Sequence, residues 1–195
     1  MTSIPSLEPG IHIITGSAKS GKSHLLRYLM HECRKTFTSG IAFSPCAKVT
    51  GELDFIDPAH VHSDYDEAVL MTWLEEQASS PSFCIVDDAT CWGSVQLRRL
   101  ASLARGLAVT FIVLTQYFPS VPPVIRNNAI NIFAFDARGS SAVKALFMAT
   151  HHGIGAESFK SFIAEATSEP YNFMWFNGKS LGLARCPTVI PNFTV

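Results

Sequence analysis

One short run of residues constrains this chain more than any other feature. The segment Gly16–Ser23 reads GSAKSGKS and matches the pattern G-x-x-x-x-G-K-[ST] at every fixed position. It follows the apolar segment Ile11–Thr15, which predicts a buried strand, and leads into Lys22–Arg34, which predicts a helix. A strand, a glycine-rich turn and a helix N-terminus in that order surround a phosphate with backbone N–H groups and partial positive charge.

Two side chains of this run carry the expected chemistry. Lys22 would reach the β- and γ-phosphates of a nucleotide, and the hydroxyl of Ser23 would ligate Mg²⁺. The alternative is a Gly/Ser-rich turn that merely joins a strand to a helix, but the match and its context favour ATP or GTP binding. The predicted nucleotide-binding residues are Gly16, Ser17, Ala18, Lys19, Ser20, Gly21, Lys22, Ser23 and His24.

A pair of acidic residues follows a later apolar run. Phe83–Asp87 predicts a strand, and Asp87 and Asp88 stand at its end. A carboxylate in that place can hold Mg²⁺, so Asp87 is the predicted metal ligand beside Ser23. Asp88 would then orient or activate the attacking water, although Asp is one methylene shorter than the Glu usual there. The alternative for both residues is a simple turn or helix cap.

Two further residues are candidates for sensing and completing the site. The apolar run Ala108–Thr115 predicts a central parallel strand, and Gln116 follows it. Its amide could hydrogen-bond the γ-phosphate or the attacking water, or it could be an ordinary polar residue at a strand end. After a proline-rich loop, Arg126 is expected to be exposed and to serve as an arginine finger for a neighbouring subunit. A surface arginine with a local carboxylate is the alternative, and Arg105 competes for the finger role.

The whole chain alternates short β-rich runs with helical patterns, which indicates an α/β domain with a mostly parallel sheet. A single domain over residues 1–195 is expected, because no linker or repeat divides the chain. The segment Ser44–Ser63 has no clear secondary structure and is a candidate pore loop. The other expected strands are Gly40–Phe43 and Ile130–Phe135, with a closing hairpin of Tyr171–Phe176 and Leu181–Arg185; the other expected helices are Asp64–Ala78, Ser94–Arg105, Ser140–Ala149 and Ala156–Ala166.

Composition excludes several classes of protein. Hydrophobic residues make up 47% of the 195 residues and charged residues 16%, which excludes a disordered chain. Fifteen Lys and Arg against sixteen Asp and Glu exclude a polybasic nucleic-acid coat protein. No apolar run approaches the ~20 residues that span a bilayer, and no signal peptide is evident. Five scattered cysteines without a CxxC pattern favour a reducing compartment, so an intracellular, non-secreted protein is expected.

Together these motifs resemble the FtsK/HerA superfamily of P-loop motors, and most of all the small genome-packaging ATPases of poxvirus-like and adenovirus-like double-stranded DNA viruses. The likeness is carried by Gly16–Ser23, by Phe83–Asp88 and by the stretch from Arg105 to Asn128, which contains TQYFPSVPPVIRNN. It implies a RecA-like P-loop NTPase core: a mostly parallel central sheet flanked by helices, with a C-terminal β-hairpin.

The resemblance also implies a function. Members form homo-oligomeric rings, pentamers or hexamers, and use ATP and Mg²⁺ to drive double-stranded DNA into a preformed capsid. Viral capsid or portal vertex proteins are then the expected partners, and the place of action is the site of virus assembly in the host cell or the virion. Gln116 falls on the sensor position of the family.

Two other functions compete with the motor. A small P-loop kinase that phosphorylates a small-molecule acceptor would suit the chain length, but such kinases carry several arginines in a lid, and only Arg126 stands in that region. A nucleotide-binding scaffold with little turnover is favoured only by Asp88. Gln116, after a further apolar strand, favours the motor.

Overall fold

Strands from the whole length of the chain form one twisted sheet. The computed structural model describes residues 4–195 except 78–79, 89–93, 138 and 151–152. Within that part of the chain, eight strands lie in the order β3-β2-β4-β5-β1-β6-β7-β8, with β7 and β8 antiparallel to their neighbours and the others parallel. The strands are β1 Gly10–Thr15, β2 Ser39–Phe43, β3 Val61–His62, β4 Ser82–Val86, β5 Val109–Thr115, β6 Ala129–Ala134, β7 Asn172–Phe176 and β8 Leu181–Arg185.

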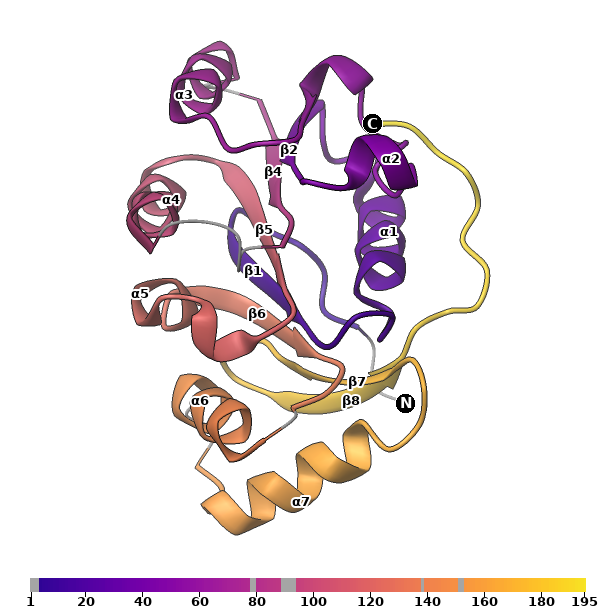
Figure 1. Ribbon diagram of the computed structural model, residues 1–195, viewed down its shortest axis with the longest axis vertical. Helices are drawn as coiled ribbons and strands as arrows, with labels where there is room; N and C mark the ends of the chain where they lie inside the picture. The colour runs from indigo at the N-terminus through magenta and orange to yellow at the C-terminus, as the bar shows by residue number, and fades with distance from the viewer. Residues whose placement is uncertain (1–3, 78–79, 89–93, 138, 151–152) are drawn as a thin grey trace.

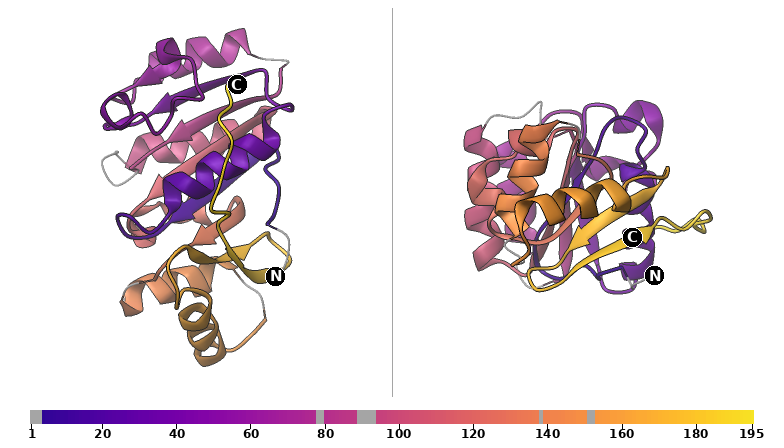
Figure 2. Two further views of the ribbon diagram at one scale, coloured as in Figure 1. Left: turned by 90° about the vertical axis from the view of Figure 1, so that its right-hand side faces the viewer. Right: turned by 90° about the horizontal axis from the view of Figure 1, so that it is seen from below.

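Helices cover both faces of the sheet and give the molecule three layers (Figure 1). One face carries α1 (Lys22–Cys33) and the short α2 (Ala47–Thr50). The other face carries the remaining α-helices, as the view from below also shows (Figure 2). These are α3 Glu67–Glu76, α4 Ser94–Gly106, α5 Pro123–Arg126, α6 Ser140–Thr150 and α7 Ala156–Ala166; 3₁₀ turns lie at η1 Pro58–His60 and η3 Phe118–Ser120.

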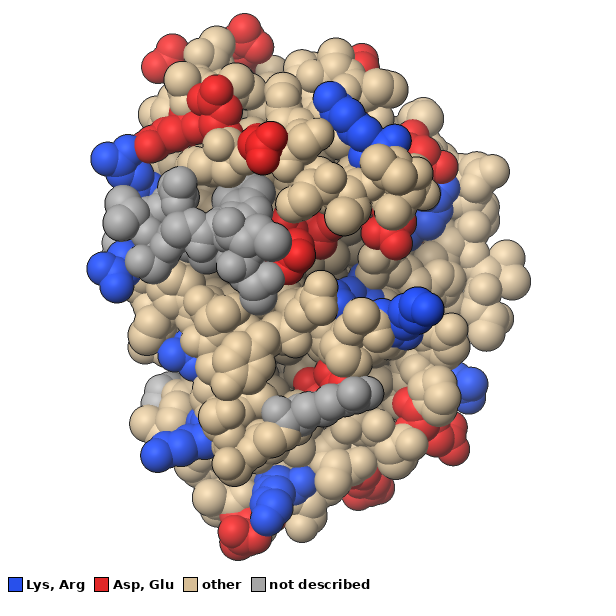
Figure 3. Space-filling view, in the orientation of Figure 1, with Lys and Arg blue, Asp and Glu red and all other residues tan. Residues whose placement is uncertain are grey.

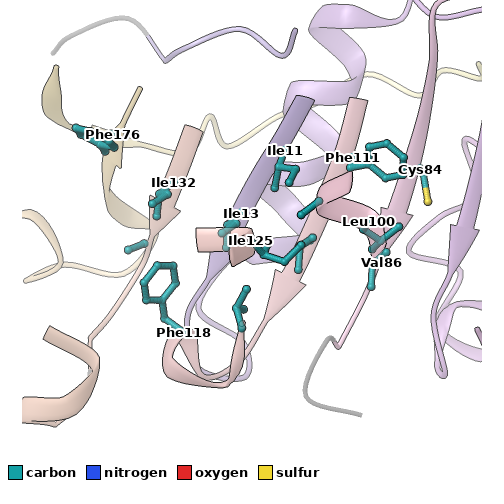
Figure 4. Close-up of a cluster of buried hydrophobic side chains, with 14 of the residues drawn as sticks. Ile11, Ile13, Cys84, Val86, Leu100, Phe111, Phe118, Ile125, Ile132 and Phe176 are labelled. Carbon is teal, nitrogen blue, oxygen red and sulfur yellow. The ribbon is translucent and has the colours of Figure 1, made fainter. Parts of the chain in front are cut away.

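The strands divide their side chains between two hydrophobic cores. In β4, Cys84 and Val86 face the core beneath α3–α7, whereas Phe83 and Ile85 face the core beneath α1. This alternation follows from the two-residue period of a strand. Figure 4 shows part of the first core, where Ile125 of α5 is fully buried. Wholly apolar strands are therefore possible, because both faces of the sheet are covered.

The carboxyl ends of three central strands bring the site together. In the register of the sheet, Thr15 at the end of β1 pairs with Thr115 of β5 and with Ala134 of β6. The Gly16 N–H donates to the Thr115 carbonyl at 3.2 Å, and the Phe135 N–H donates to the Thr15 carbonyl at 3.0 Å. Segments far apart in the sequence therefore leave the sheet side by side, in the place where ligands bind to parallel α/β sheets.

The predicted fold class is confirmed, and two local predictions need correction. The helix expected from Asp64 begins at Glu67, because the Asp66 carboxylate caps it by accepting the N–H groups of Ala68 and Val69; its expected end at Ala78 lies outside the described residues. Residues 44–63 do hold secondary structure, namely α2, η1 and β3. These elements are two to four residues long, too short for a periodic pattern to reveal.

The C-terminal residues form a strap over α1. Residues 186–195 leave β8 and cross the outer side of this helix toward α2 (Figures 1 and 2). The strap ends with the Val195 N–H donating to the carbonyl of Phe55 at 2.9 Å. No helix in the described part of the chain is both long and apolar enough to cross a membrane.

Candidate nucleotide-binding site

The loop between β1 and α1 requires glycine at both of its fixed glycine positions. Gly16 has a φ of 155° and Gly21 a φ of 114°. A Cβ at Gly16 would lie 2.6 Å from Ser20 Oγ and 2.9 Å from the Cβ of Phe135, and one at Gly21 would lie 3.0 Å from ring carbons of Phe135 and Tyr171. Any larger residue would therefore push this loop away from its neighbours and distort the phosphate-binding backbone.

The side chain of Lys22 folds back over the hollow of the loop. Its Nζ donates to the carbonyl of Gly16 at 2.8 Å and to the carbonyl of Ser17 at 2.9 Å. Burial lowers the pKa of Lys22, and surrounding carboxylates oppose that shift by favouring the ammonium; they belong, from the largest effect down, to Asp87, Asp136, Asp88 and Glu52. The loop thus holds one cation among several acidic side chains, and Figure 3 shows acidic and basic atoms meeting near the centre of this face.

Asp87, directly after β4, has a carboxylate held in place by two donors. The Ser44 hydroxyl donates to its Oδ2 at 2.7 Å, and the backbone N–H of Asp88 donates to its Oδ1 at 2.8 Å. Asp88 itself has a φ of 50°, a conformation that non-glycine residues seldom adopt. A fixed carboxylate at this strand end is what a magnesium-binding residue requires.

Ser23 meets an acidic residue that the sequence did not suggest. Its hydroxyl donates to the Glu52 carboxylate at 3.1 Å. Glu52 lies just beyond α2, in the segment expected to lack secondary structure, and no motif marks it. The loop, β4 and the segment after α2 therefore contribute one oxygen-bearing side chain each to the same region.

The oxygen groups of Ser23, Asp87 and Glu52 fit Mg²⁺, which prefers hard oxygen ligands. Among the described residues, no three His, Cys, Asp or Glu side chains gather closely enough to hold a metal ion by themselves. Mg²⁺ in nucleotide sites takes only one or two protein ligands and completes its shell with phosphates and water. The observed donor set therefore fits a magnesium–nucleotide complex better than a stand-alone metal centre.

Gln116, directly after β5, is exposed beside the loop as its predicted sensor role requires. Together with Ser17 and Asp136 it lines a small cavity of about 60 Å³. Asp136 follows β6, and its Oδ1 accepts the backbone N–H of Ser17 at 2.7 Å. No motif marks Asp136; its place directly after the apolar run Ile130–Phe135 is the sequence signal that could have found it.

Arg126 is less accessible than its sequence context predicts. It ends α5, and its guanidinium lies 5.5 Å from the centre of the Phe118 ring. Its Nε is buried and has no hydrogen-bond partner among the described residues, and burial lowers the pKa of Arg126. The expectation of an exposed arginine is thus wrong, because the turn at η3 brings Phe118 against it. The competing Arg105 lies in α4, and its side chain is outside the described part of the structure.

The side chain of His24 contacts the C-terminal strap. Its ring hydrogen-bonds the carbonyl of Pro187 in the strap, at 2.5 Å. The first turn of α1 is thereby tied to the C-terminal residues. A contact between His24 and a nucleotide stays a prediction.

No protein-family model matches this chain. An uncharacterised protein, 075L of Invertebrate iridescent virus 6, is 24% identical over 172 residues, which cover 80% of this chain and 66% of that relative. The chain thus spans about two thirds of the length of this viral protein.

Solved structures share the fold at low sequence identity. The genome packaging NTPase B204 of Sulfolobus turreted icosahedral virus 2, in complex with AMPPCP, has a TM-score of 0.67 and 16% identity over 90% of this chain and 97% of its own. The conjugation coupling protein TcpA of pCW3, with ATPγS, has a TM-score of 0.63 and 13% identity over 91% of this chain and 60% of its own. The fold is that of the P-loop NTPases, and viral genome-packaging NTPases are among its structural neighbours.

Proposed function

We propose that this chain is an ATP-hydrolysing motor that translocates double-stranded DNA and packages a viral genome into a preformed capsid. One observation carries the proposal: the glycine-rich loop, the fixed carboxylate of Asp87 and the exposed amide of Gln116 follow the carboxyl ends of β1, β4 and β5. The fold likeness to a packaging NTPase and to a conjugation coupling protein supports the choice of a motor over other P-loop proteins.

The loop would bind the triphosphate of ATP through its backbone N–H groups. Lys22, now bonded to two carbonyls of the loop, would turn its ammonium to the β- and γ-phosphates. The positive end of α1 adds to this attraction. The same groups would leave the adenosine outside the hollow, so they give affinity for any nucleoside triphosphate.

Ser23 and Asp87 would hold Mg²⁺, with Glu52 keeping the Ser23 hydroxyl in place. When bound, the ion neutralises charge on the phosphate oxygens. The Ser44 hydroxyl and the Asp88 N–H keep the Asp87 carboxylate from rotating away. The Asp87 carboxylate would therefore be ordered before the nucleotide binds, so that binding loses little conformational entropy at this residue.

For hydrolysis, Asp88 would accept a proton from the water that attacks the γ-phosphorus, and ADP would leave. Gln116 would hydrogen-bond the γ-phosphate or that water and so distinguish ATP from ADP. Arg126 of a neighbouring subunit would add positive charge to the transition state. The packing of Arg126 on Phe118 would hold its guanidinium in one orientation, which supports this role. In a ring, each subunit would present its Arg126 to the nucleotide of the next subunit.

The proposed assembly is a homo-oligomeric ring, a pentamer or a hexamer, around double-stranded DNA, docked on capsid or portal vertex proteins. The formal net charge of −1 supports contact with DNA through a few loops rather than through a general basic surface. The iridovirus relative supports action at the site of virus assembly in a host cell or in the virion.

The decisive experiment measures ATP turnover with Mg²⁺, with and without double-stranded DNA, over a series of protein concentrations. We expect turnover per subunit to rise with concentration and with DNA, and Lys22→Ala to abolish it while the fold stays intact. Lys179→Ala, an exposed lysine in the turn between β7 and β8, is the matched control. Retained hydrolysis in Lys22→Ala would refute the site, whereas phosphate transfer to a small acceptor would indicate a kinase.

A further inference from the structure

A second pocket adjoins the phosphate loop on the side away from Asp87. It has a volume of about 290 Å³ and lies between residues 17–20 of the loop and residues 167–172, which join α7 to β7. In the sheet order, β6 and β7 lie on one side of β1, whereas β4, which leads to Asp87, lies on the other. The pocket therefore lies on the opposite side of the loop from Asp87, and Phe135, Asp136 and Glu169 are among the residues that line it.

One aromatic residue at this pocket is exposed in an unusual backbone conformation. Tyr171 is 49% exposed, whereas residues 173–176, just beyond it in β7, are all buried. Its φ of 66° is one that residues with a Cβ rarely adopt. Such a conformation persists only where the surroundings enforce it, and it is concentrated at binding sites.

The surroundings of Tyr171 do fix its position. Its carbonyl accepts the N–H of Cys186 at 3.0 Å, and the N–H of Asn172 donates to the carbonyl of Glu169 at 3.2 Å. At the other end of the segment, the Thr167 hydroxyl donates to the carbonyl of Ile163 at 2.8 Å. The segment is thus a turn with bonded ends, and the ring is presented in one place before any ligand binds.

The ring also stands directly beside the phosphate loop. Its Cδ1 would lie 3.0 Å from a Cβ at Gly21, the residue before Lys22. Phosphates in the hollow of the loop would therefore have the Tyr171 ring as a neighbour. The rest of a nucleotide must leave that hollow on one side. On the other side stand Asp87, Asp88 and Glu52, whose carboxylates face Lys22. On the pocket side, the carboxylate of Asp136 accepts the Ser17 N–H through its Oδ1 at 2.7 Å.

We propose that this pocket receives the nucleobase of the bound nucleoside triphosphate, with Tyr171 as the stacking platform. The inference rests on the proposed function, because it requires phosphates at Lys22. An exposed aromatic ring suits a planar heteroaromatic base, and stacking is tolerant of base identity because every base has a π-face. Tyr171 thus gives the site little preference among nucleobases, so ATP and GTP should bind with similar affinity.

The test compares three ligands of the whole chain by calorimetry with Mg²⁺ present: ATP, GTP and inorganic tripolyphosphate, which has no base. Tyr171→Asn removes the ring and is the suitable variant, because asparagine tolerates a positive φ. Tyr171→Phe keeps the ring and is the matched control. Thermal unfolding of each variant reports whether the turn is intact.

For Tyr171→Asn we expect ATP and GTP to bind roughly fivefold to a hundredfold more weakly, and tripolyphosphate to bind as it does to the unsubstituted chain. Tyr171→Phe should bind all three ligands normally. Unchanged ATP affinity in Tyr171→Asn would overturn the base pocket, and so would an equal loss for tripolyphosphate, since the residue would then act on the loop. If the unsubstituted chain binds neither ATP nor tripolyphosphate, the proposed function fails and the pocket with it.

Discussion

The hydroxyl of Ser23 donates a hydrogen bond to the carboxylate of Glu52, 29 residues further along the chain, at 3.1 Å. Ser23 is the second residue of α1, whereas Glu52 follows α2 on the same face of the sheet. A serine hydroxyl that gives its proton to a carboxylate keeps a lone pair free and fixed in direction. Glu52 is therefore a positioning residue for the predicted Mg²⁺ ligand.

Glu52→Gln should raise the Mg²⁺ concentration that nucleotide binding requires. The neutral amide keeps the shape of the side chain but attracts the Ser23 proton less strongly, so the hydroxyl loses its fixed orientation. We expect the Mg²⁺ concentration for half-maximal binding of a fluorescent ADP to rise by about tenfold. This is the low end of the effect seen for residues that support metal ligands, because Glu52 is exposed. Glu32→Gln, also exposed, is the control, and equal Mg²⁺ curves for all three proteins would exclude the role.

The parts of the site that the sequence predicted are those with fixed spacing at the ends of apolar strands. Gly16–Ser23 and Asp87 each follow a buried strand directly, so a local pattern is enough to find them. The fold class follows from the same alternation of strands and helices, since a parallel sheet needs a crossover between neighbouring strands.

The residues that were missed come to the site through the topology of the sheet. Asp136 reaches Ser17 because β6 pairs with β1, although 119 residues separate them in the sequence. Glu52 reaches Ser23 because the short α2 turns the chain back toward α1, and four helical residues leave no periodic pattern. Tyr171 stands at the start of the hairpin, where only its φ of 66° distinguishes it, and a sequence does not display a backbone angle.

The strap over α1 should contribute measurably to stability. The Phe193 ring stacks on Phe55 with centroids 5.1 Å apart, and the Arg27 guanidinium lies 5.6 Å from the Phe193 centroid. Because Phe193 is partly buried, Phe193→Ala should lower the free energy of unfolding by about 1–2 kcal/mol. The corresponding fall in Tm is about 2–8 °C for a chain of this size.

The comparison for this variant is Val189→Ala, in the same strap but 81% exposed. Urea unfolding of both proteins gives the difference directly. A double variant with Phe55→Ala should lose less than the sum of the two single losses, because the rings stabilise each other. If the two single losses in unfolding free energy add in full in the double variant, contact between the Phe193 and Phe55 rings does not stabilise the strap.

Stability should fall in mild acid because of His12 in β1. Its ring is fully buried: Nε2 hydrogen-bonds the carbonyl of Glu8 at 2.7 Å, and Nδ1 faces Nδ2 of Asn131 at 3.1 Å. With Nε2 as the donor to Glu8, Nδ1 accepts a hydrogen bond from the Asn131 amide. Protonation of Nδ1 would therefore place its new N–H against the N–H of Asn131. Burial lowers the pKa of His12 from 6.5 to about 4, against a smaller raising effect of the Glu8 carbonyl.

The unfolded chain therefore binds this proton before the folded one does. The contribution of neutral His12 to the free energy of unfolding is complete above about pH 6.5 and declines as the pH falls from 6.5 toward 4. Below that pH it is lost, and the total loss is roughly 3 kcal/mol. Urea unfolding at several pH values measures the slope. In His12→Gln the slope between pH 6.5 and 4 should be shallower than in the unsubstituted chain; an equal slope would mean that another group is responsible.

If Arg126 acts across a subunit interface, two inactive variants should restore each other. Lys22→Ala subunits lack a working phosphate loop but keep Arg126, whereas Arg126→Ala subunits lack the arginine and keep the loop. In a mixed ring, an Arg126→Ala site beside a Lys22→Ala neighbour has both Lys22 and the neighbour's Arg126. Turnover should therefore appear on mixing, at up to about a quarter of the original rate per subunit for random equal mixing, because half the subunits have a working loop and half of the neighbours carry the arginine.

Two measurements give this experiment its control. Arg126→Ala alone should still bind ATP, since the arginine would act on a neighbour's transition state rather than on ground-state binding. Because Arg126 packs on Phe118, thermal unfolding must establish that this variant keeps its fold. Folded, nucleotide-binding variants that stay inactive together at every ratio would exclude Arg126 as the residue acting in trans, and full activity of Arg126→Ala alone would exclude it from catalysis altogether.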